Sequence, residues 1–319
     1  MKALVTGANG FTGSHLCQRL LERGDQVTAY VRRTSDLSRL DNLAVEFAYG
    51  AITDQTTLET AMKGVDLIFH TAAYVELGLV DADLMEQVNV GGTKAVLAAA
   101  QKATGVTKMV YCSTIGVYGD TQGRLIDETF ERQQTDFSSA YDRTKYLAQQ
   151  AVDAAAKHGF PVVSVMPSGI FGPGDPHFGK VVQLFLKGGL KVWAGAKRVT
   201  GIVHVDDLVE AMILASEQSQ AGEHYIISAG ELTTGEMFQI FSDETGIATP
   251  TEIPEPMVRL AGNLLDPIGR LFNWQPPLSR ERVHYLYDRC VRVSADKART
   301  QLGWQPRSVQ ETLRDLVQP

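Results

Sequence analysis

Short apolar runs alternate with longer stretches of helical periodicity through the first half of the chain. The apolar runs are continuous, which is typical of strands in a parallel sheet that helices cover on both faces. This alternation predicts an α/β fold built on a doubly wound parallel sheet. The expected strands are Lys2–Thr6, Gln26–Val31, Val45–Ala48, Leu67–His70, Lys108–Ser113 and Pro161–Met166. The expected helices are Thr12–Arg23, Thr56–Met62, Leu84–Thr104 and Ser139–His158.

Glycine and proline become frequent after Pro173, where the regular alternation stops. We therefore expect one large unit in residues 1–175, to which segments near 201–230 return. A smaller and less regular portion, formed by residues 176–200 and 231–319, is expected to cover the substrate.

Composition and charge narrow the class of protein. The chain has 319 residues, 44% of them apolar, and a formal net charge of -7. The negative charge argues against anionic partners, which bind to basic surfaces, so we expect no nucleic acid and no membrane partner. Its three cysteines lie far apart without CxxC spacing, which predicts neither a disulfide framework nor a zinc site and fits a reducing compartment. The first apolar run stops at Thr6-Gly7, too early for a signal peptide, so we expect a soluble, cytoplasmic protein.

Three glycines with the spacing G-x-x-G-x-x-G, Gly7, Gly10 and Gly13, follow the first expected strand directly. Glycines allow a tight turn and let backbone N–H groups approach a pyrophosphate, and the helix N-terminus that follows adds about half a positive charge. A strand before the loop, a helix after it and a second strand beyond are the context that such a loop requires. The pattern predicts that a dinucleotide binds here.

The second expected strand ends in two arginines, Arg32 and Arg33. NAD-selective sites usually place a carboxylate at this point for the ribose 2′-hydroxyl, and a carboxylate would repel the 2′-phosphate of NADP. A guanidinium binds that phosphate through charge-assisted hydrogen bonds. We therefore expect NADP, contacted by Arg32, with NAD as the alternative if both arginines are only solvated loop residues.

Tyr141 and Lys145 are four residues apart in an expected helix, so both side chains leave the same face. A free phenol has a pKa of about 10, and proton transfer near neutrality asks for a pKa roughly 3 lower, worth about 4 kcal/mol. One ammonium about 4 Å away supplies on the order of 4 kcal/mol at an effective dielectric constant of about 20. The same spacing is common on surface helices, but in a dinucleotide enzyme it predicts a general acid/base.

Thr114 follows the fifth expected strand, at the edge where open α/β sheets bind ligands. Its hydroxyl is a candidate to hydrogen-bond the reacting oxygen and equally a candidate cap of a turn. Cys112 lies in the same apolar strand without a base paired to it, so we interpret it as a small buried side chain rather than a nucleophile. No metal site is expected from the scattered histidines His70, His177 and His204.

Motifs spread over nearly the whole chain carry a family resemblance. They are V-T-G-A-N-G-F-T-G (Val5–Gly13), V-R-R-T-S-D (Val31–Asp36), H-T-A-A (His70–Ala73), N-V-G-G-T (Asn89–Thr93), S-T-I-G-V-Y-G (Ser113–Gly119), Y-D-R-T-K (Tyr141–Lys145), P-S-G-I-F-G-P-G-D (Pro167–Asp175) and V-H-V-D-D (Val203–Asp207). Together they resemble the extended short-chain dehydrogenase/reductases of the NAD-dependent epimerase/dehydratase-like family, especially the group around dihydroflavonol 4-reductase. The resemblance implies a Rossmann fold, a nicotinamide cofactor and oxidoreductase activity.

The resemblance also implies roles for single residues. Tyr141 is then the general acid/base, Lys145 binds the nicotinamide ribose and lowers the tyrosine pKa, and Thr114 takes the catalytic Ser/Thr role. Asn89 stands where the family has a structural asparagine near the site. The residues expected to contact the cofactor are Gly7, Gly10, Phe11, Thr12, Gly13, Arg32, Ile52, Ala72, Ala73, Tyr141, Lys145, Pro167 and Ile170.

Three positions depart from the family pattern. Ala51 replaces an aspartate that usually contacts the adenine, so adenine recognition is expected to rest on Ile52 and on backbone groups. Ile115-Gly116 stands where sugar-nucleotide dehydratases carry an Asp-Glu pair, which argues against 4,6-dehydratase chemistry. Met166 stands where an arginine is common, and the sequence offers no interpretation of it.

Three functions compete. The first is NADP(H)-dependent reduction of a ketone or aldehyde, or oxidation of the alcohol, on a small apolar or aromatic substrate, with Tyr141 moving the proton. The second is an NAD-dependent nucleotide-sugar epimerase, against which Arg32 weighs. The third is a redox-sensing binding protein without catalysis, against which the intact Tyr141/Lys145 pair speaks. In each case the helices Leu84–Thr104 and Ser139–His158 are suited to pair across a homodimer interface.

Val258–Trp274 is an apolar segment interrupted by Arg259, Asp266 and Arg270. A membrane-surface helix is one interpretation of such a segment. Because it has no basic cluster, we favour an amphipathic helix packed over the substrate cleft. An apolar cover of this kind favours an apolar carbonyl substrate over a diphosphate-bearing sugar.

Overall fold

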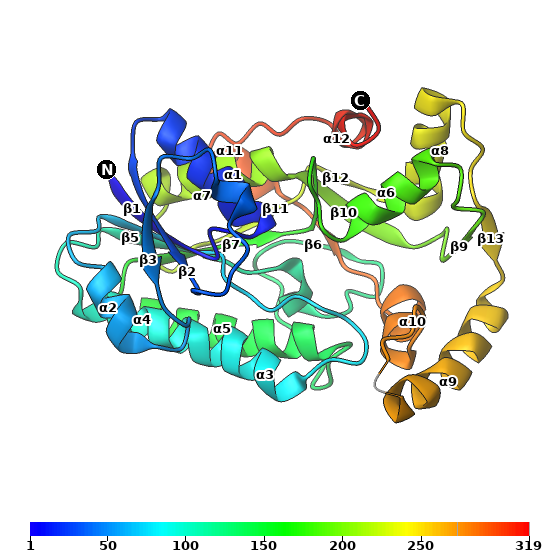
Figure 1. Ribbon diagram of the computed structural model, residues 1–319, viewed down its shortest axis with the longest axis horizontal. Coiled ribbons are helices and arrows are strands. Elements are labelled where there is room, and N and C mark those ends of the chain that lie inside the picture. Colours follow the sequence, from blue (N-terminus) through cyan, green and yellow to red (C-terminus); the bar gives the residue numbers. More distant parts are fainter. Residues whose placement is uncertain (273, 319) are drawn as a thin grey trace.

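A seven-stranded parallel sheet forms the centre of the computed structural model, which describes residues 1–272 and 274–318. Its strands are β1 (Lys2–Thr6), β2 (Gln26–Val31), β3 (Glu46–Tyr49), β4 (Leu67–His70), β5 (Lys108–Cys112), β7 (Val162–Pro167) and β11 (His224–Ile227). The strand order is β11-β7-β5-β4-β1-β2-β3, and all neighbouring pairs are parallel. The order runs outward from β1 in both directions, which confirms the doubly wound α/β fold predicted from the sequence (Figure 1).

Helices cover both faces of this sheet (Figure 1). One face carries α1 (Phe11–Glu22), α7 (Val205–Gln218) and α11 (Asp296–Gln301). The other face carries α2 (Gln55–Ala61), α3 (Ala82–Glu86), α4 (Gly92–Lys102) and α5 (Ala140–Lys157). The expected single helix Leu84–Thr104 is interrupted, because a π-helical turn, η2 (Gln87–Gly91), separates α3 from α4.

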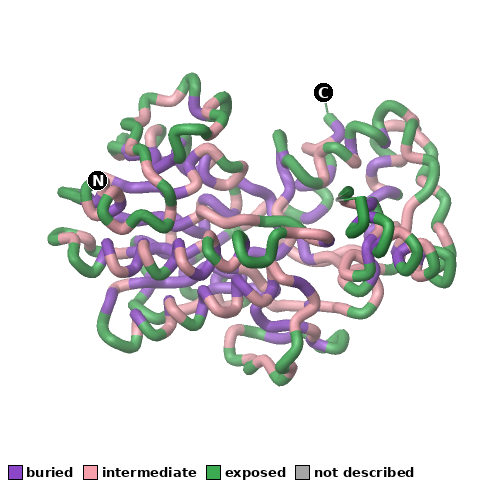
Figure 2. Tube along the Cα trace, turned by 60° about the horizontal axis from the view of Figure 1, so that its bottom comes forward, coloured by how far each residue is buried: buried purple, intermediate pink, exposed green. Residues whose placement is uncertain are grey.

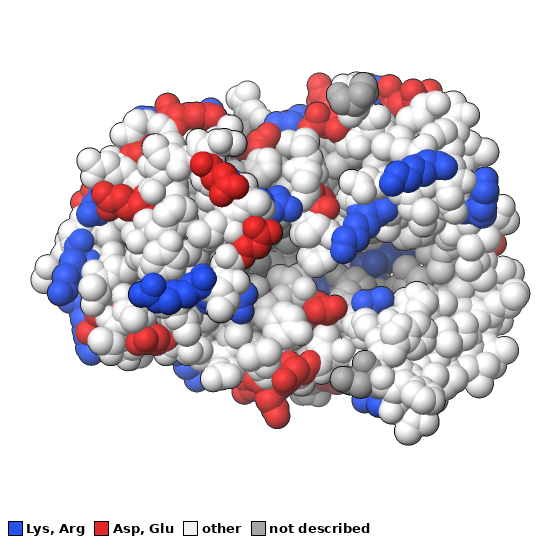
Figure 3. Space-filling model, in the orientation of Figure 1, with Lys and Arg blue, Asp and Glu red and all other residues white. Residues whose placement is uncertain are grey.

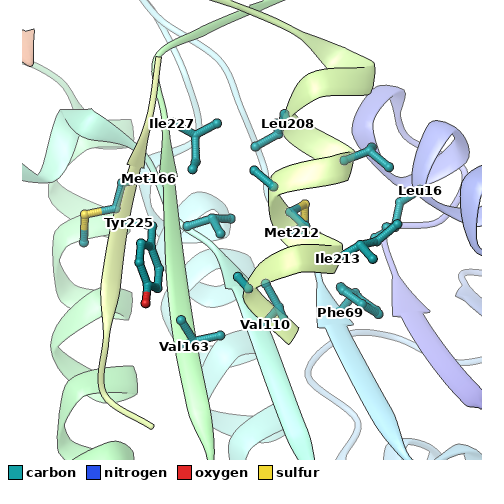
Figure 4. Packing of buried hydrophobic residues seen from close by; sticks show 14 of the residues in the cluster. Leu16, Phe69, Val110, Val163, Met166, Leu208, Met212, Ile213, Tyr225 and Ile227 are labelled. Carbon is teal, nitrogen blue, oxygen red and sulfur yellow. The ribbon is translucent and has the colours of Figure 1, made fainter. Parts of the chain in front are cut away.

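Successive residues of each strand point to opposite faces of the sheet, and both faces are buried. In β1, Ala3 and Val5 join the core beneath α1 and α7, whereas Leu4 joins the core on the opposite face. Figure 4 shows the first of these cores, where Leu16 of α1 and Met212 of α7 lie over the strands. Figure 2 shows the same distribution along the whole chain, with buried residues on the strands and exposed residues mainly at the turns.

The second part of the molecule lies beyond one end of the sheet (Figure 1). Its strands are β8 (Gly169–Phe171), β10 (Val199–His204) and β12 (Gly230–Thr233) in one sheet, and the pairs β9 (Val192–Ala194) with β13 (Thr251–Ile253) and β6 (Leu125–Ile126) with β14 (Arg292–Val293). Its helices are α6 (Phe178–Leu186), α8 (Thr234–Thr245), α9 (Glu255–Leu271), α10 (Arg280–Tyr287) and α12 (Val309–Asp315), and the short turns η1 (Ser38–Leu40) and η3 (Ile115–Tyr118) complete the fold. The division into two units at the expected residues stays a prediction.

α9 is oriented differently from the expectation. Its buried residues are Val258, Gly262, Asp266 and Gly269. Five of its large apolar side chains are exposed, namely Met257, Leu260, Leu264, Ile268 and Leu271. The prediction that its apolar face packs over the cleft is wrong, because most of its large apolar side chains are at the surface and two glycines lie on the buried face. Of the helices that the structure describes, none is both long and apolar enough to cross a membrane.

Candidate active site

Two adjoining cavities open along the carboxyl ends of the parallel strands, the edge where sheets of this kind bind ligands. Their volumes are about 510 and 460 Å³, and they share Gly7, Gly10, Thr71 and Ala73 in their walls. The larger cavity also contains Phe11, Thr12, Gly13, Thr114, Tyr141, Lys145, Pro167 and Ile170. The smaller one also contains Arg32, Ile52 and Ala72. The structure thus brings every site residue selected from the sequence to one continuous cleft.

The glycine loop is shaped by close backbone contacts. Gly7 has a φ of +69°, and a β-carbon on it would lie 2.7 Å from the backbone of Ala72. A β-carbon on Gly13 would lie 2.1 Å from the carbonyl oxygen of Gly7. α1 begins directly behind the loop, and within the described residues no side chain caps it and no acidic residue occupies its first turn. Its free N–H groups and positive dipole end therefore fit a pyrophosphate.

Arg32 and Ser35 line the smaller cavity after the end of β2. The Ser35 Oγ is buried and has no hydrogen-bond partner among the residues described. Arg33 turns elsewhere, with its guanidinium 5.2 Å from the centre of the Tyr49 ring. A guanidinium beside an unpaired buried hydroxyl suits an oxygen-rich anion such as a phosphate. The sequence does not predict Ser35 as a site residue, because a serine three residues beyond an arginine forms no recognisable motif.

Tyr30 anchors the loop in which Ala51 replaces the expected aspartate. Its hydroxyl donates to the Ala51 carbonyl at 2.9 Å and shares a hydrogen bond with the Thr57 hydroxyl at 2.6 Å. A β-carbon on Gly50 would lie 2.1 Å from the Tyr30 hydroxyl oxygen, so this position has no room for a side chain. Ile52 and the ordered backbone of this loop form the wall of the smaller cavity, where the aspartate is missing.

α5 places Tyr141 and Lys145 one helical turn apart in the larger cavity. Ser139 caps the helix by accepting a hydrogen bond from the Asp142 N–H at 3.0 Å, which holds Tyr141 in the first turn. Lys145 is 3% exposed, and its Nζ donates to the Cys112 carbonyl at 2.7 Å. The ammonium also lies 4.4 Å from the centre of the Tyr111 ring, a favourable cation–π contact. These contacts hold the ammonium inside the cleft.

Burial governs the protonation of this pair. It raises the pKa of Tyr141 above the ordinary phenol value, and the Lys145 ammonium partly opposes the rise. Burial likewise lowers the pKa of Lys145. The estimate that one ammonium brings the phenol near neutrality is therefore wrong for the protein alone, because it left out the cost of desolvating the phenolate. The protein holds Tyr141 as a protonated phenol.

Thr114, Ser113 and Ser168 bring three hydroxyl groups to the wall of the larger cavity. Thr114 caps η3, since its Oγ1 accepts the Gly116 N–H at 3.1 Å. A hydroxyl has one donor and two lone pairs, so its O–H stays available, and the two roles weighed from the sequence are compatible. The Oγ atoms of Ser113 and Ser168 are buried without a partner in the described part of the chain. Ser168 was not selected from the sequence.

Tyr285 lines the larger cavity between two guanidinium groups. Arg198 lies 4.4 Å and Arg289 4.6 Å from the centre of its ring. Arg289 forms a buried ion pair with Asp142, whereas Arg198 has no acidic partner among the described residues and its Nε is buried without a hydrogen bond. Arg198 and Asp142 are far along the chain from Tyr285 and Arg289, so no sequence motif predicts this group of residues.

Residues 3–228 match the model of the NAD dependent epimerase/dehydratase family. The chain belongs to this family. It is 32% identical to the sterol demethylase protein B of Methylococcus capsulatus, over 99% of this chain and 97% of that protein. It is 33% identical to the 3-beta-hydroxysteroid dehydrogenase of Mycolicibacterium neoaurum, over 96% of this chain and 87% of that protein. The solved UDP-glucose 4-epimerase of Thermus thermophilus with NAD is 25% identical with a TM-score of 0.78, covering 99% of this chain and 98% of that one.

These likenesses confirm the family resemblance read from the motifs. Dihydroflavonol 4-reductase-like and hydroxysteroid dehydrogenase-like proteins are both among the relatives of this family member. The protein is an NAD(P)-dependent dehydrogenase or reductase of the extended short-chain type.

Asn89 joins three parts of the site in this epimerase/dehydratase family member. Its Oδ1 accepts the Tyr74 N–H at 2.7 Å, and its Nδ2 donates to the Tyr74 carbonyl and to the Thr144 hydroxyl, both at 3.0 Å. Asn89 belongs to the π-helical turn η2, so the interruption of the long helix coincides with these bonds. They hold the loop after β4 against α5, next to Lys145.

The surroundings of Cys112 and His70 indicate structural rather than catalytic roles. Burial raises the pKa of the Cys112 thiol, which keeps it protonated. His70 is bonded to the hydroxyls of Thr6 at 2.7 Å and Thr93 at 3.0 Å. Burial, followed by the nearby Lys145 ammonium, lowers the pKa of His70 to about 3, so its ring is neutral and links β4 to its neighbours.

Met166, which the sequence left without an interpretation, is a core residue of β7. It is 1% exposed, and its Sδ accepts the hydroxyl of Tyr118 at 3.1 Å. Figure 4 shows Met166 next to Tyr225 of β11 in the core. At the position where the family often has an arginine, this chain therefore buries an apolar side chain beneath the site.

Proposed function

We propose that the protein is an NADP(H)-dependent oxidoreductase that interconverts an alcohol and a ketone on an apolar, steroid-like substrate. The observation that carries this proposal is the convergence of Tyr141, Lys145 and Thr114 on a cavity that continues to the glycine loop and Arg32. The sterol and hydroxysteroid named for two relatives support the substrate class.

The catalytic residues divide the chemistry between them. A bound nicotinamide cofactor supplies or accepts the hydride at the carbonyl carbon. In the reducing direction the buried phenol of Tyr141 donates its proton to the substrate oxygen, and in the oxidising direction its phenolate takes the alcohol proton. Thr114 donates a hydrogen bond to the same oxygen, which stabilises the negative charge that develops there. Lys145 stabilises the phenolate, and the donors that it does not give to Cys112 are available for the ribose hydroxyls.

Arg32 and Ser35 support NADP as the cofactor. Both line the cavity at the end of β2, where a carboxylate would favour NAD. A 2′-phosphate there gains the charge of Arg32 and gives the Ser35 hydroxyl its missing partner.

Other reactions of the family have less support. A β-carbon on Gly116 would lie 2.4 Å from the Asp142 Oδ1, so an acidic dehydratase side chain has no room there. An NAD-dependent nucleotide-sugar epimerase would use the same Tyr141 and Lys145, and the solved epimerase relative holds NAD, but Arg32 weighs against it. The complete catalytic set weighs against a binding protein without catalysis.

The substrate wall supports an apolar molecule with one polar group. Val75, Ile115, Val199 and Val291 line the larger cavity. Arg198 and Arg289 both add a guanidinium to this wall, and of the two only Arg289 has a carboxylate partner, Asp142, among the described residues. A rigid ring system fits the apolar wall, and a hydroxyl, carbonyl or carboxylate on it finds a donor in Arg198.

A paired substrate screen tests the proposal. Hydroxysteroids and ketosteroids are compared with UDP-glucose and UDP-galactose, each with NADP(H) and with NAD(H), by the absorbance of reduced nicotinamide. We expect steroid turnover with kcat/KM at least about tenfold higher for NADPH than for NADH, the factor that one charge-assisted contact provides. Interconversion of the two sugars without net change in nicotinamide would instead establish the epimerase.

A further inference from the structure

α9 carries a stripe of large apolar side chains at the surface of the molecule. In this stripe, Met257, Leu260, Leu264, Ile268 and Leu271 are between 45% and 77% exposed. Phe272 and Trp274, 72% and 47% exposed, extend the stripe beyond the end of the helix. At about 100° per residue the five helical positions of the stripe fall within about 80° of the helix circumference. Figure 3 shows the corresponding lower right region as largely uncharged surface.

The helix turns its small residues inward. A β-carbon on Gly262 would lie 2.6 Å from a methyl group of Val283 in α10, and one on Gly269 would lie 2.6 Å from the Trp274 carbonyl. An amphipathic helix on a water-exposed protein surface normally turns its large apolar side chains inward, because their burial stabilises the packing of the helix. The orientation of α9 is explained when its outer face is also buried, against something outside this chain.

The charges of α9 are neutralised beside the stripe. Arg259 is paired with Glu255 at 2.7 Å and with Asp288 at 2.6 Å, and Arg270 is paired with the buried Asp266 at 2.8 Å. The helix therefore presents an apolar face without a free charge of its own. Its partner is accordingly a neutral surface rather than an anionic or a cationic one.

The size of the stripe favours a lipid surface over a second copy of the chain. A helix of 17 residues is about 26 Å long and about 10 Å wide, so its face covers a few hundred Å². A stable protein interface needs roughly 800 Å² from each partner. An interfacial helix needs no such area, because it inserts its apolar face alone, roughly 5–10 Å into the boundary of the bilayer.

We propose that α9 is a membrane-surface helix whose stripe, from Met257 to Trp274, inserts into the interface of a neutral lipid bilayer. Phe272 and Trp274 at its end are side chains typical of that interface. This inference reverses the interpretation of the segment from sequence, because the structure shows the apolar face unoccupied by the rest of the chain that is described.

Membrane binding brings the substrate cleft to the lipid. α9 packs on α10, which contributes Tyr285 to the cavity wall. α10 also holds the loop that follows Val75 of the cavity wall, since Glu281 accepts the Gly78 N–H at 2.9 Å and Arg282 donates to the Leu77 carbonyl at 3.1 Å. A steroid dissolved in the bilayer then reaches the cleft without crossing water. This consequence rests on the proposed function, whereas the binding of lipid by α9 does not.

Vesicle flotation of the full chain tests the proposal. We expect the protein to float with phosphatidylcholine vesicles and to float no better when phosphatidylglycerol is added. Leu260→Ser/Leu264→Ser, and independently Leu271→Ser/Phe272→Ser, should reduce the bound fraction at least about tenfold. The control Leu125→Ser/Phe47→Ser removes side chains that are 61% and 40% exposed elsewhere on the surface and should float like the wild type.

Three results would overturn the proposal. In the first, the wild-type protein does not float with the vesicles. In the second, the stripe variants float as well as the wild type. In the third, light scattering shows that the wild type is a dimer and that the stripe substitutions convert it to a monomer. Circular dichroism accompanies each variant, and unchanged melting is expected because the substituted side chains are exposed. Flotation does not require turnover, so a negative steroid screen would reject the proposed function while leaving this result standing.

Discussion

Asp142 and Arg289 form an ion pair with 3.1 Å between Oδ2 and Nε, and less than a tenth of either side chain is exposed. Asp142 follows the proposed catalytic Tyr141 directly and accepts the Ser138 hydroxyl at 2.5 Å. Arg289 lines the larger cavity. The pair thus ties the start of α5 to the wall of the substrate cleft.

Asp142→Asn should lower the free energy of unfolding by about 3 kcal/mol, because it leaves the Arg289 charge buried without a counter-ion. Urea denaturation measures the change. The matched control is Glu244→Gln, which breaks an exposed pair with Arg314 and should cost less than about 1 kcal/mol. An equal decrease in the free energy of unfolding in the two variants would show that the buried pair contributes no more to stability than the exposed pair.

Tyr141→Phe should reduce kcat roughly a hundred- to ten-thousand-fold and leave dinucleotide affinity close to that of the wild type, because it removes a proton without emptying the site. Steady-state kinetics and calorimetric titration with the cofactor measure the two effects. Tyr146→Phe removes a hydroxyl from the same helix outside the cleft and serves as control. Near-normal turnover of Tyr141→Phe would contradict the role of Tyr141 as general acid/base.

The pH profiles of the two directions should differ in sign. A raised pKa keeps Tyr141 protonated to higher pH. Ketone reduction, which uses the phenol, should be constant through neutral pH and fall in the alkaline range, and alcohol oxidation, which uses the phenolate, should rise with pH. A reduction rate that already falls below neutral pH would contradict the assignment.

Lys145→Met should move the alkaline decline of ketone reduction to higher pH and weaken cofactor binding. The first effect follows because the ammonium opposes the rise of the Tyr141 pKa. The second follows because the ribose loses its donor. The pH profile of kcat and the dissociation constant of the cofactor check both. Full recovery of the alcohol-oxidation rate at high pH, together with unchanged cofactor affinity, would reject the ribose contact.

Arg32→Ala should weaken NADP binding about ten- to a hundredfold, since a charge-assisted contact to phosphate is worth roughly 1.5–3 kcal/mol, and should hardly change NAD binding. Ser35→Ala should add a smaller loss in the same direction. Arg33→Ala is the matched control, because that guanidinium lies against Tyr49. The readout is the ratio of kcat/KM for NADPH and NADH. A wild type that prefers NADH, or a ratio that Arg32→Ala leaves unchanged, would show that Arg32 does not select NADP and would favour the epimerase.

Local patterns were sufficient wherever neighbours along the chain create the feature. The glycine loop, the Tyr141/Lys145 pair and the end of β2 at Arg32 are each set within a few residues, so the sequence predicts them and the structure places them in one cleft. The continuous apolar strands likewise predict a sheet covered on both faces, because period and burial are local properties.

The sequence by itself determined the doubly wound sheet, the glycine loop and the spacing of the candidate catalytic residues. Only the tertiary structure decided which distant side chains share a wall, such as Arg198 and Tyr285, because contacts across such separations follow from the path of the whole chain. It also decided the orientation of α9. Hydrophobic periodicity shows that a helix has an apolar face but not what lies against it, and the close approach of Gly262 to Val283 turned the large side chains outward.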